Sequence, residues 1–144
     1  YIYYYLFMNL ITKLETFCRD NLDAFIAYSL AFIFIFFGAL KVLDISPVRD
    51  VVEASVPLFK NDILFLGLGA FEVLVGIGLL FKKTRKLASY LIIMHLIGTF
   101  VTAVINPSLT FSAETIVTVH GEFVAKNLVL IAAAVYLATR EEKN

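Results

Sequence analysis

Apolar residues in this chain gather in four long blocks rather than in alternating or narrow helical stripes. The blocks cover residues Leu22–Leu43, Ile63–Phe81, Leu87–Ile105 and His120–Ala138. A helix of about 20 mostly apolar residues is long enough to cross the ~30 Å hydrocarbon core of a bilayer. The pattern therefore predicts an all-α membrane protein, an antiparallel four-transmembrane-helix bundle that occupies residues 1–144 as a single domain.

The segments between the blocks are short and polar. Residues Asn9–Asp23 place apolar side chains at helical spacing between charged ones, which predicts a short N-terminal interfacial helix leading into the first span. Residues Val48–Val56 are expected to form a short helix that ends before Pro57. We interpret Lys82–Lys86 (KKTRK) as a tight basic loop and Pro107–Val119 as a second long connection.

Composition supports this assignment and excludes other classes of protein. Hydrophobic residues make up 60% of the chain, against about 45–50% in soluble domains. The formal net charge is zero, and no basic stripe carries stacking aromatics outside the apolar blocks, so no nucleic-acid partner is expected. The single cysteine, Cys18, excludes an internal disulfide and a cysteine-rich metal site.

The basic residues predict an orientation. An even number of spans places both termini on the side of the KKTRK segment, and the opposite side has only Arg49 and Lys60 in its connections. Because cytoplasmic segments carry the excess of Lys and Arg, both termini are expected in the cytoplasm, with a bacterial inner membrane as the location. The basic residues on the cytoplasmic side are Lys13, Arg19, Lys82, Lys83, Arg85, Lys86, Arg140 and Lys143.

Seven polar side chains fall inside or at the ends of the apolar blocks, where burial of a polar group in hydrocarbon is costly and often marks function. Two of them, Lys41 and His95, also have ordinary explanations. Lys41 is near a span end, and we favour an ammonium that snorkels to the interface. For His95 we favour a hydrogen-bonded structural role. The full set is Lys41, Glu72, His95, His120, Glu122, Lys126 and Asn127.

Small residues accompany two of these charged groups. Gly38 and Lys41 share one helical face, as do Gly69, Glu72 and Gly76. Because glycine lets membrane helices approach closely, Glu72 is expected to point at another helix.

The predicted topology places the seven polar residues in one outward-facing crevice, with Glu72 and His95 near mid-depth and the others in the outer half. An ion-pair network that fixes the four helices is one interpretation, and we favour it slightly. The other is a site for a polar head group, such as a quinone ring, or a proton path. No residues follow a spacing that is specific for metal ligands. His95 and His120 could ligate a haem, but two histidines at different depths are weak evidence for one.

Four stretches resemble the DoxX family of small four-span membrane proteins. The most specific is the Gly-aromatic-Lys-Asn order within HGEFVAKN, formed here by Gly121, Phe123, Lys126 and Asn127. Lys41 and Glu72 also match recurrent polar positions of that family. The stretches are FGALKVLDISPV, GAFEVLVGIGLL, GTFVTAVINPSLTF and HGEFVAKNLVLIAAA.

The resemblance implies a membrane subunit associated with a redox system, either thiosulfate oxidation with quinone or an oxidative-stress complex, so that quinone is one candidate cofactor. The implied partners are the lipid bilayer and a protein oxidoreductase. In our first hypothesis the chain anchors or assists that oxidoreductase and admits quinone near Lys41, Glu72 and Lys126. The alternatives are a purely structural or assembly subunit of a larger membrane complex, and a small transporter.

Overall fold

The computed structural model describes residues 1–112 and 116–140, and most of them are helical. Four helices are long and apolar enough to cross a membrane: α1, α3, α4 and α6. This confirms the four predicted spans by length and composition. The elements are α1 (Ile2–Val42), α2 (Arg49–Ser55), the 3-10 helix η1 (Pro57–Lys60), α3 (Asp62–Leu80), α4 (Lys82–Ile105), α5 (Pro107–Thr110), β1 (Phe111–Ser112), β2 (Ile116–Val117) and α6 (Val119–Thr139).

The long helices pack around one apolar core. Contacts join α1 to α3, α3 to α4, α4 to α6 and α6 back to α1. Side chains from all four meet in the core, among them Leu30, Leu79, Ile92 and Leu137. Many large apolar side chains on the outside remain exposed, as expected for helices whose outer faces contact lipid.

Glycines set the spacing between α1 and α3. A Cβ atom added to Gly38 would lie 2.7 Å from the carbonyl oxygen of Gly69, and one added to Gly76 would lie 2.7 Å from Ile35 Cγ1. No side chain fits at that separation, so the two backbones touch. The predicted close approach at Gly38, Gly69 and Gly76 is therefore confirmed.

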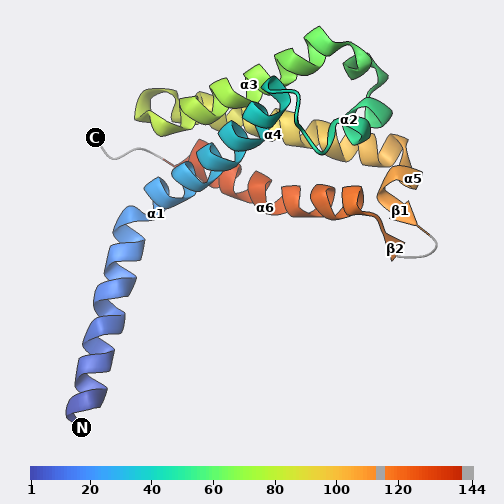
Figure 1. The fold of residues 1–144 in the computed structure, drawn as a ribbon. Coiled ribbons are helices and arrows are strands. Elements are labelled where there is room, and N and C mark those ends of the chain that lie inside the picture. Colours follow the sequence, from blue (N-terminus) through green and yellow to red (C-terminus); the bar gives the residue numbers. More distant parts are fainter. Residues whose placement is uncertain (113–115, 141–144) are drawn as a thin grey trace.

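The N-terminal part of the chain is helical but is not a separate helix. Figure 1 shows residues before the bundle, in dark blue, continuing into the first span as one helix that projects away from the other elements. Residues 1–23 contain no glycine or proline, so nothing in the sequence interrupts the helix before the span. The placement of this part at a membrane interface stays a prediction.

The sequence predicted a loop at the basic KKTRK segment, and this prediction is wrong. The segment forms the first turn of α4. Phe81 alone connects α3 to α4, in an extended conformation. Side chains of α4 satisfy carbonyls at the end of α3: Thr84 Oγ1 donates to Gly78 O (2.7 Å) and Arg85 Nε donates to Leu79 O (3.0 Å). Because these carbonyls have partners, a longer capping loop is not needed.

The first long connection, between α1 and α3, starts with a tight helix end. Asp44 adopts the left-handed conformation (φ 57°), and Ile45 N donates to Leu40 O (3.0 Å) while Asp44 N donates to Lys41 O (3.2 Å). This is the Schellman pattern, in which a left-handed residue satisfies the last carbonyls of a helix. The chain then forms α2 before Pro57, as predicted.

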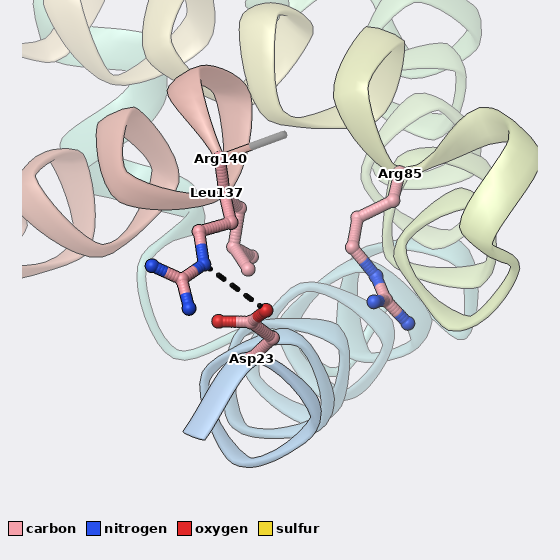
Figure 2. A pocket seen from close by; sticks show the side chains of 4 residues that line it. All are labelled: Asp23, Arg85, Leu137 and Arg140. Carbon is pink, nitrogen blue, oxygen red and sulfur yellow. Dashed lines mark hydrogen bonds and ion pairs between the residues drawn. The ribbon is translucent and has the colours of Figure 1, made fainter. Parts of the chain in front are cut away.

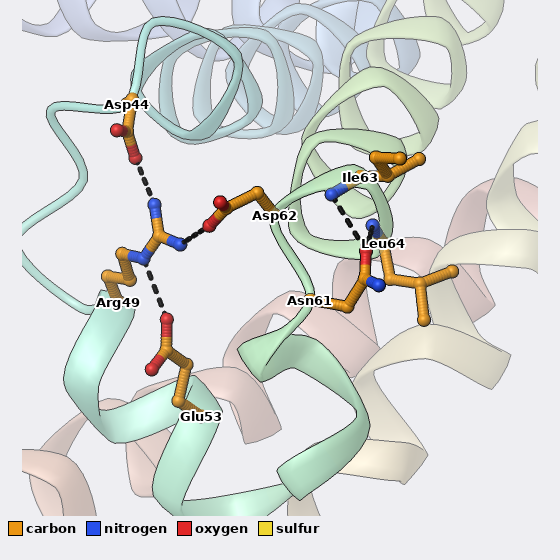
Figure 3. Close-up of polar contacts among 7 residues, drawn as sticks. All are labelled: Asp44, Arg49, Glu53, Asn61, Asp62, Ile63 and Leu64. Atoms are coloured by element: carbon orange, nitrogen blue, oxygen red, sulfur yellow. Dashed lines mark hydrogen bonds and ion pairs between the residues drawn. The ribbon is translucent and has the colours of Figure 1, made fainter.

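Arg49 of α2 holds this connection against the start of α3. Its guanidinium donates to Glu53 Oε1 (2.7 Å) and also to Asp44 and Asp62, and it stacks on Phe65 (4.9 Å to the ring centre). Figure 3 shows the three carboxylates around the guanidinium. The hydrogen bonds to Glu53 and Asp62, with the contribution of Asp44, raise the pKa of Arg49 above its ordinary value.

We expect Arg49→Lys to lower the thermal unfolding temperature, because a lysine cannot present a planar fork to three carboxylates at once. The loss should shrink in high salt, since two of the carboxylates, Asp44 and Asp62, are largely exposed (70% and 84%) and are therefore screened. Unfolding in detergent at low and high salt checks this, with Asp50→Asn on the same helix as the control. Equal unfolding temperatures for Arg49→Lys and the parent chain would contradict the role.

The second long connection, between α4 and α6, covers the start of α6. Phe111 pairs with Val117 and Ser112 with Ile116 in an antiparallel two-stranded ladder. The Thr118 side chain caps α6 by accepting from Gly121 N (3.1 Å). A Cβ atom at Gly121 would lie 2.2 Å from Thr110 O, so only glycine lets α6 start beneath α5.

Candidate functional site

Three of the seven predicted polar residues meet in the protein core. Lys41 of α1 donates from Nζ to Glu72 Oε2 of α3 at 2.6 Å, and His95 Nε2 of α4 lies 3.2 Å from Glu72 Oε1. Lys41 and Glu72 are only 6% and 5% exposed. One carboxylate therefore ties together three membrane-length helices.

The backbone geometry explains why these groups can meet. Lys41 lies one turn after Gly38 and Glu72 lies one turn after Gly69, so each charge is beside the point of closest helix approach. A Cβ atom on Gly69 would lie 2.7 Å from Lys41 Cβ. The missing side chain at Gly69 therefore makes room for the lysine stem.

The contact is enclosed by protein rather than open to lipid. The His95 ring lies against Phe34 and Phe71, with ring centres 6.0 and 5.8 Å away. In such a low-dielectric setting an unpaired charge is costly, and a paired one is tolerated only when its hydrogen bonds are made. Both Glu72 oxygens have partners, so the expectation that Glu72 points at another helix is confirmed.

This contact bears on the interpretations of two single residues. Lys41 does not snorkel to the interface, because its ammonium is buried on Glu72. The physical reason is that a counter-charge 2.6 Å away replaces the water that a snorkelling lysine would seek. His95 has the polar contact expected of a structural histidine.

The other four predicted residues do not join this contact, so the single outward-facing crevice is wrong. Lys126 Nζ donates to Glu122 Oε2 at 3.2 Å, and both side chains are exposed (70% and 62%). The ammonium also lies over the Phe123 ring, 5.8 Å from its centre. The i,i+4 pairing inside α6 holds Lys126 on the outer face, away from Glu72.

Asn127 and His120 occupy two further positions on α6. Asn127 Nδ2 donates to Thr99 Oγ1 at 2.9 Å and so connects α6 to α4. His120 is half-buried near the start of α6, and its Nε2 is buried without a hydrogen-bond partner. The seven residues therefore divide into a buried contact, a surface ion pair, an interhelical amide contact and a separate histidine.

Sequence reasoning missed a second polar cluster at the opposite end of the helices. Asp23 of α1 accepts a hydrogen bond from Tyr136 Oη (2.7 Å) and pairs with Arg140 Nε (3.3 Å). Figure 2 shows Asp23 facing Arg140, with Arg85 of α4 reaching the same end. The predicted topology already placed the start of the first span beside the end of the fourth, and that adjacency was the available signal.

A quinone held between Lys41, Glu72 and Lys126 does not fit this arrangement. Both oxygens of Glu72 are engaged by Lys41 and His95, and Lys126 is on an exposed face in contact with Glu122. Within residues 1–112 and 116–140, no three His, Cys, Asp or Glu side chains gather to hold a metal ion.

The four stretches that resemble DoxX proteins contact each other in pairs. Lys41 of the first stretch binds Glu72 of the second, and Thr99 of the third binds Asn127 of the fourth. Comparisons of this chain with models of known families, with curated proteins and with solved structures found no match.

Proposed function

We propose that this protein is a DoxX-like integral membrane subunit that anchors or assists a partner oxidoreductase. It would form an antiparallel four-span bundle in a bacterial inner membrane, with both termini in the cytoplasm. The observation that carries the proposal is the buried contact of Lys41, Glu72 and His95, in which the polar groups satisfy one another across three helices.

A closed contact of this kind suits an accessory subunit better than a catalytic one. A catalytic group needs access to a substrate, whereas Glu72 is 5% exposed and has a partner on each oxygen. Such a network serves to fix one arrangement of helices, with polar contacts in place of a hydrophobic driving force. The link to redox chemistry rests on the DoxX resemblance alone.

The surface of the helix bundle leaves room for a partner. The N-terminal part of α1 projects from the other helices (Figure 1), and its large side chains, including Tyr3, Leu10, Leu14 and Phe17, are more than half exposed. An exposed amphipathic helix contacts either a membrane surface or another protein. This segment is the natural place for an anchor to meet its oxidoreductase.

Affinity purification of the tagged chain from its native membrane tests the proposal. We expect an oxidoreductase to co-purify, and we expect Glu72→Gln to reduce the amount of assembled complex while turnover per assembled complex stays at the parent level. The matched control is Glu122→Gln, which removes an exposed carboxylate and should change neither quantity.

Two outcomes would contradict this assignment. A partner without redox activity would favour the structural or assembly subunit. Glu72→Gln complexes that assemble in full but turn over slowly would give Glu72 a direct part in proton or electron chemistry.

A further inference from the structure

An open apolar groove lies between the second half of α4 and the first half of α6, away from the Lys41–Glu72–His95 contact. It encloses about 390 Å³, which is within the range of roughly 300–1,000 Å³ typical of small-molecule sites. Its lining is almost wholly apolar and includes Phe100, Ala103 and Val104 of α4, Thr110 of α5, and Gly121 and Val124 of α6.

One polar group in this lining has no partner. Thr110 is 5% exposed, and its Oγ1 is buried without a hydrogen bond. Hydroxyls in the longer helices, such as those of Thr12 and Ser89, bond to the carbonyl four residues back. For Thr110 that carbonyl belongs to Asn106, which already accepts from Leu109 N.

A buried hydroxyl without a partner is unfavourable. Thr110 lines the groove, but its Oγ1 is buried, so the hydroxyl reaches a molecule in the groove only if the side chain rotates about its Cα–Cβ bond. There it can donate to a carbonyl oxygen. The missing partner is therefore a carbonyl carried by a largely apolar molecule.

We propose that this groove binds one acyl chain of a membrane lipid, with the chain between α4 and α6 and its carbonyl on the Thr110 hydroxyl. Thr110 follows closely on the end of α4 at Ile105, and the α4 side of the groove is formed by the last turns of that helix, from Phe100 to Val104. If α4 crosses the bilayer, this end of the helix is its part nearest the ester carbonyls of the lipids. This inference is independent of the redox assignment. The same chemistry is offered by an ester lipid and by a free fatty acid.

The absence of tryptophan from the sequence allows a direct test. Phe111→Trp places a single fluorophore in the groove lining, with Phe100→Trp as a second reporter, and Phe32→Trp on the exposed face of α1 is the control. Dibrominated stearic acid, its methyl ester and dibrominated octadecane are titrated into the purified protein in micelles. Nanodiscs of dibrominated phosphatidylcholine then show whether an intact phospholipid reaches the groove.

We expect saturable quenching at Phe111→Trp and only gradual, non-saturating quenching at Phe32→Trp. Adding Thr110→Val should weaken binding of the methyl ester or the acid about three- to tenfold, the value of one net hydrogen bond, while octadecane is unaffected. Ala103→Leu, which fills the groove, should abolish saturation. Preference for ester over acid would assign the ligand to bilayer lipid, and the reverse to free fatty acid.

The proposal is overturned if groove and control reporters are quenched alike, or if Thr110→Val affects ester and alkane equally. A dimer that shows no saturable quenching would assign the groove to a second copy of the chain. Because Thr110 Oγ1 makes no hydrogen bond within the protein, Thr110→Val keeps the shape and should fold at least as well as the parent.

Discussion

Replacing Glu72 with leucine is expected to lower the free energy of unfolding by about 3–5 kcal/mol, the range found when one partner of a buried ion pair is removed. The loss is large because Lys41, only 6% exposed, would keep its charge in the core without a counter-charge. The His95 ring would lose its polar contact at the same time. Unfolding in mixed micelles, followed by circular dichroism, measures the change.

The chain contains a matched control for this substitution. Glu122 also pairs with a lysine, but both side chains are exposed, so Glu122→Leu should cost no more than about 0.5 kcal/mol. The double variant Lys41→Met with Glu72→Leu should regain most of the stability, because two apolar side chains replace the pair. Equal losses for Glu72→Leu and Glu122→Leu would show that burial of the pair is not what matters.

The same comparison corrects an expectation from the sequence. The single crevice placed both Glu72 and Glu122 within reach of Lys126, whereas the structure pairs Lys126 with Glu122 and Lys41 with Glu72. Glu122 and Lys126 are four residues apart, so helical spacing alone is enough to bring this local pair together. The partner of Glu72 was harder to predict, because two lysines were available and only the rotation of each helix decides between them.

Sequence pattern was most reliable where one physical requirement dominates. Hydrocarbon thickness fixes the length of a span, so four spans were predictable from apolar blocks. The ends of the helices were harder to predict from the sequence. The Lys82–Lys86 segment has the charge of a loop but forms helix, because Thr84 and Arg85 bond back to carbonyls of α3. Such side-chain capping depends on a contact between helices that no local pattern encodes.

In the N-terminal part of the chain, helix was predicted correctly but its boundary was not. Its amphipathic spacing correctly indicated helix, but periodicity does not say where one helix ends and the next begins. The absence of glycine and proline from residues 1–23 was the better guide to continuity. The Asp23 cluster was overlooked because carboxylates near the start of a span are ordinary, and only the fold brings Tyr136 and Arg140 to it.

The second large effect is expected when a glycine between α1 and α3 is replaced. Gly38→Ala should destabilise the protein by about 1–3 kcal/mol, the usual cost of overpacking, because its Cβ would lie 2.7 Å from the Gly69 carbonyl oxygen and 2.9 Å from Glu72 Cβ. Neither atom is the end of a flexible side chain, so α1 and α3 must separate. That separation also pulls Lys41 away from Glu72, and Gly38→Leu should therefore be worse than Gly38→Ala.

Gly67 on α3 distinguishes packing from a general effect of glycine replacement. No heavy atom lies within 4 Å of a Cβ added there, so Gly67→Ala should stabilise the helix by about 1 kcal/mol through propensity alone. Opposite signs for Gly38→Ala and Gly67→Ala in the same micelle unfolding assay would establish close α1–α3 contact as the cause. A stabilising Gly38→Ala would mean that the two helices do not touch at Gly38, and the buried Lys41–Glu72 contact would then lack the backbone approach on which it depends.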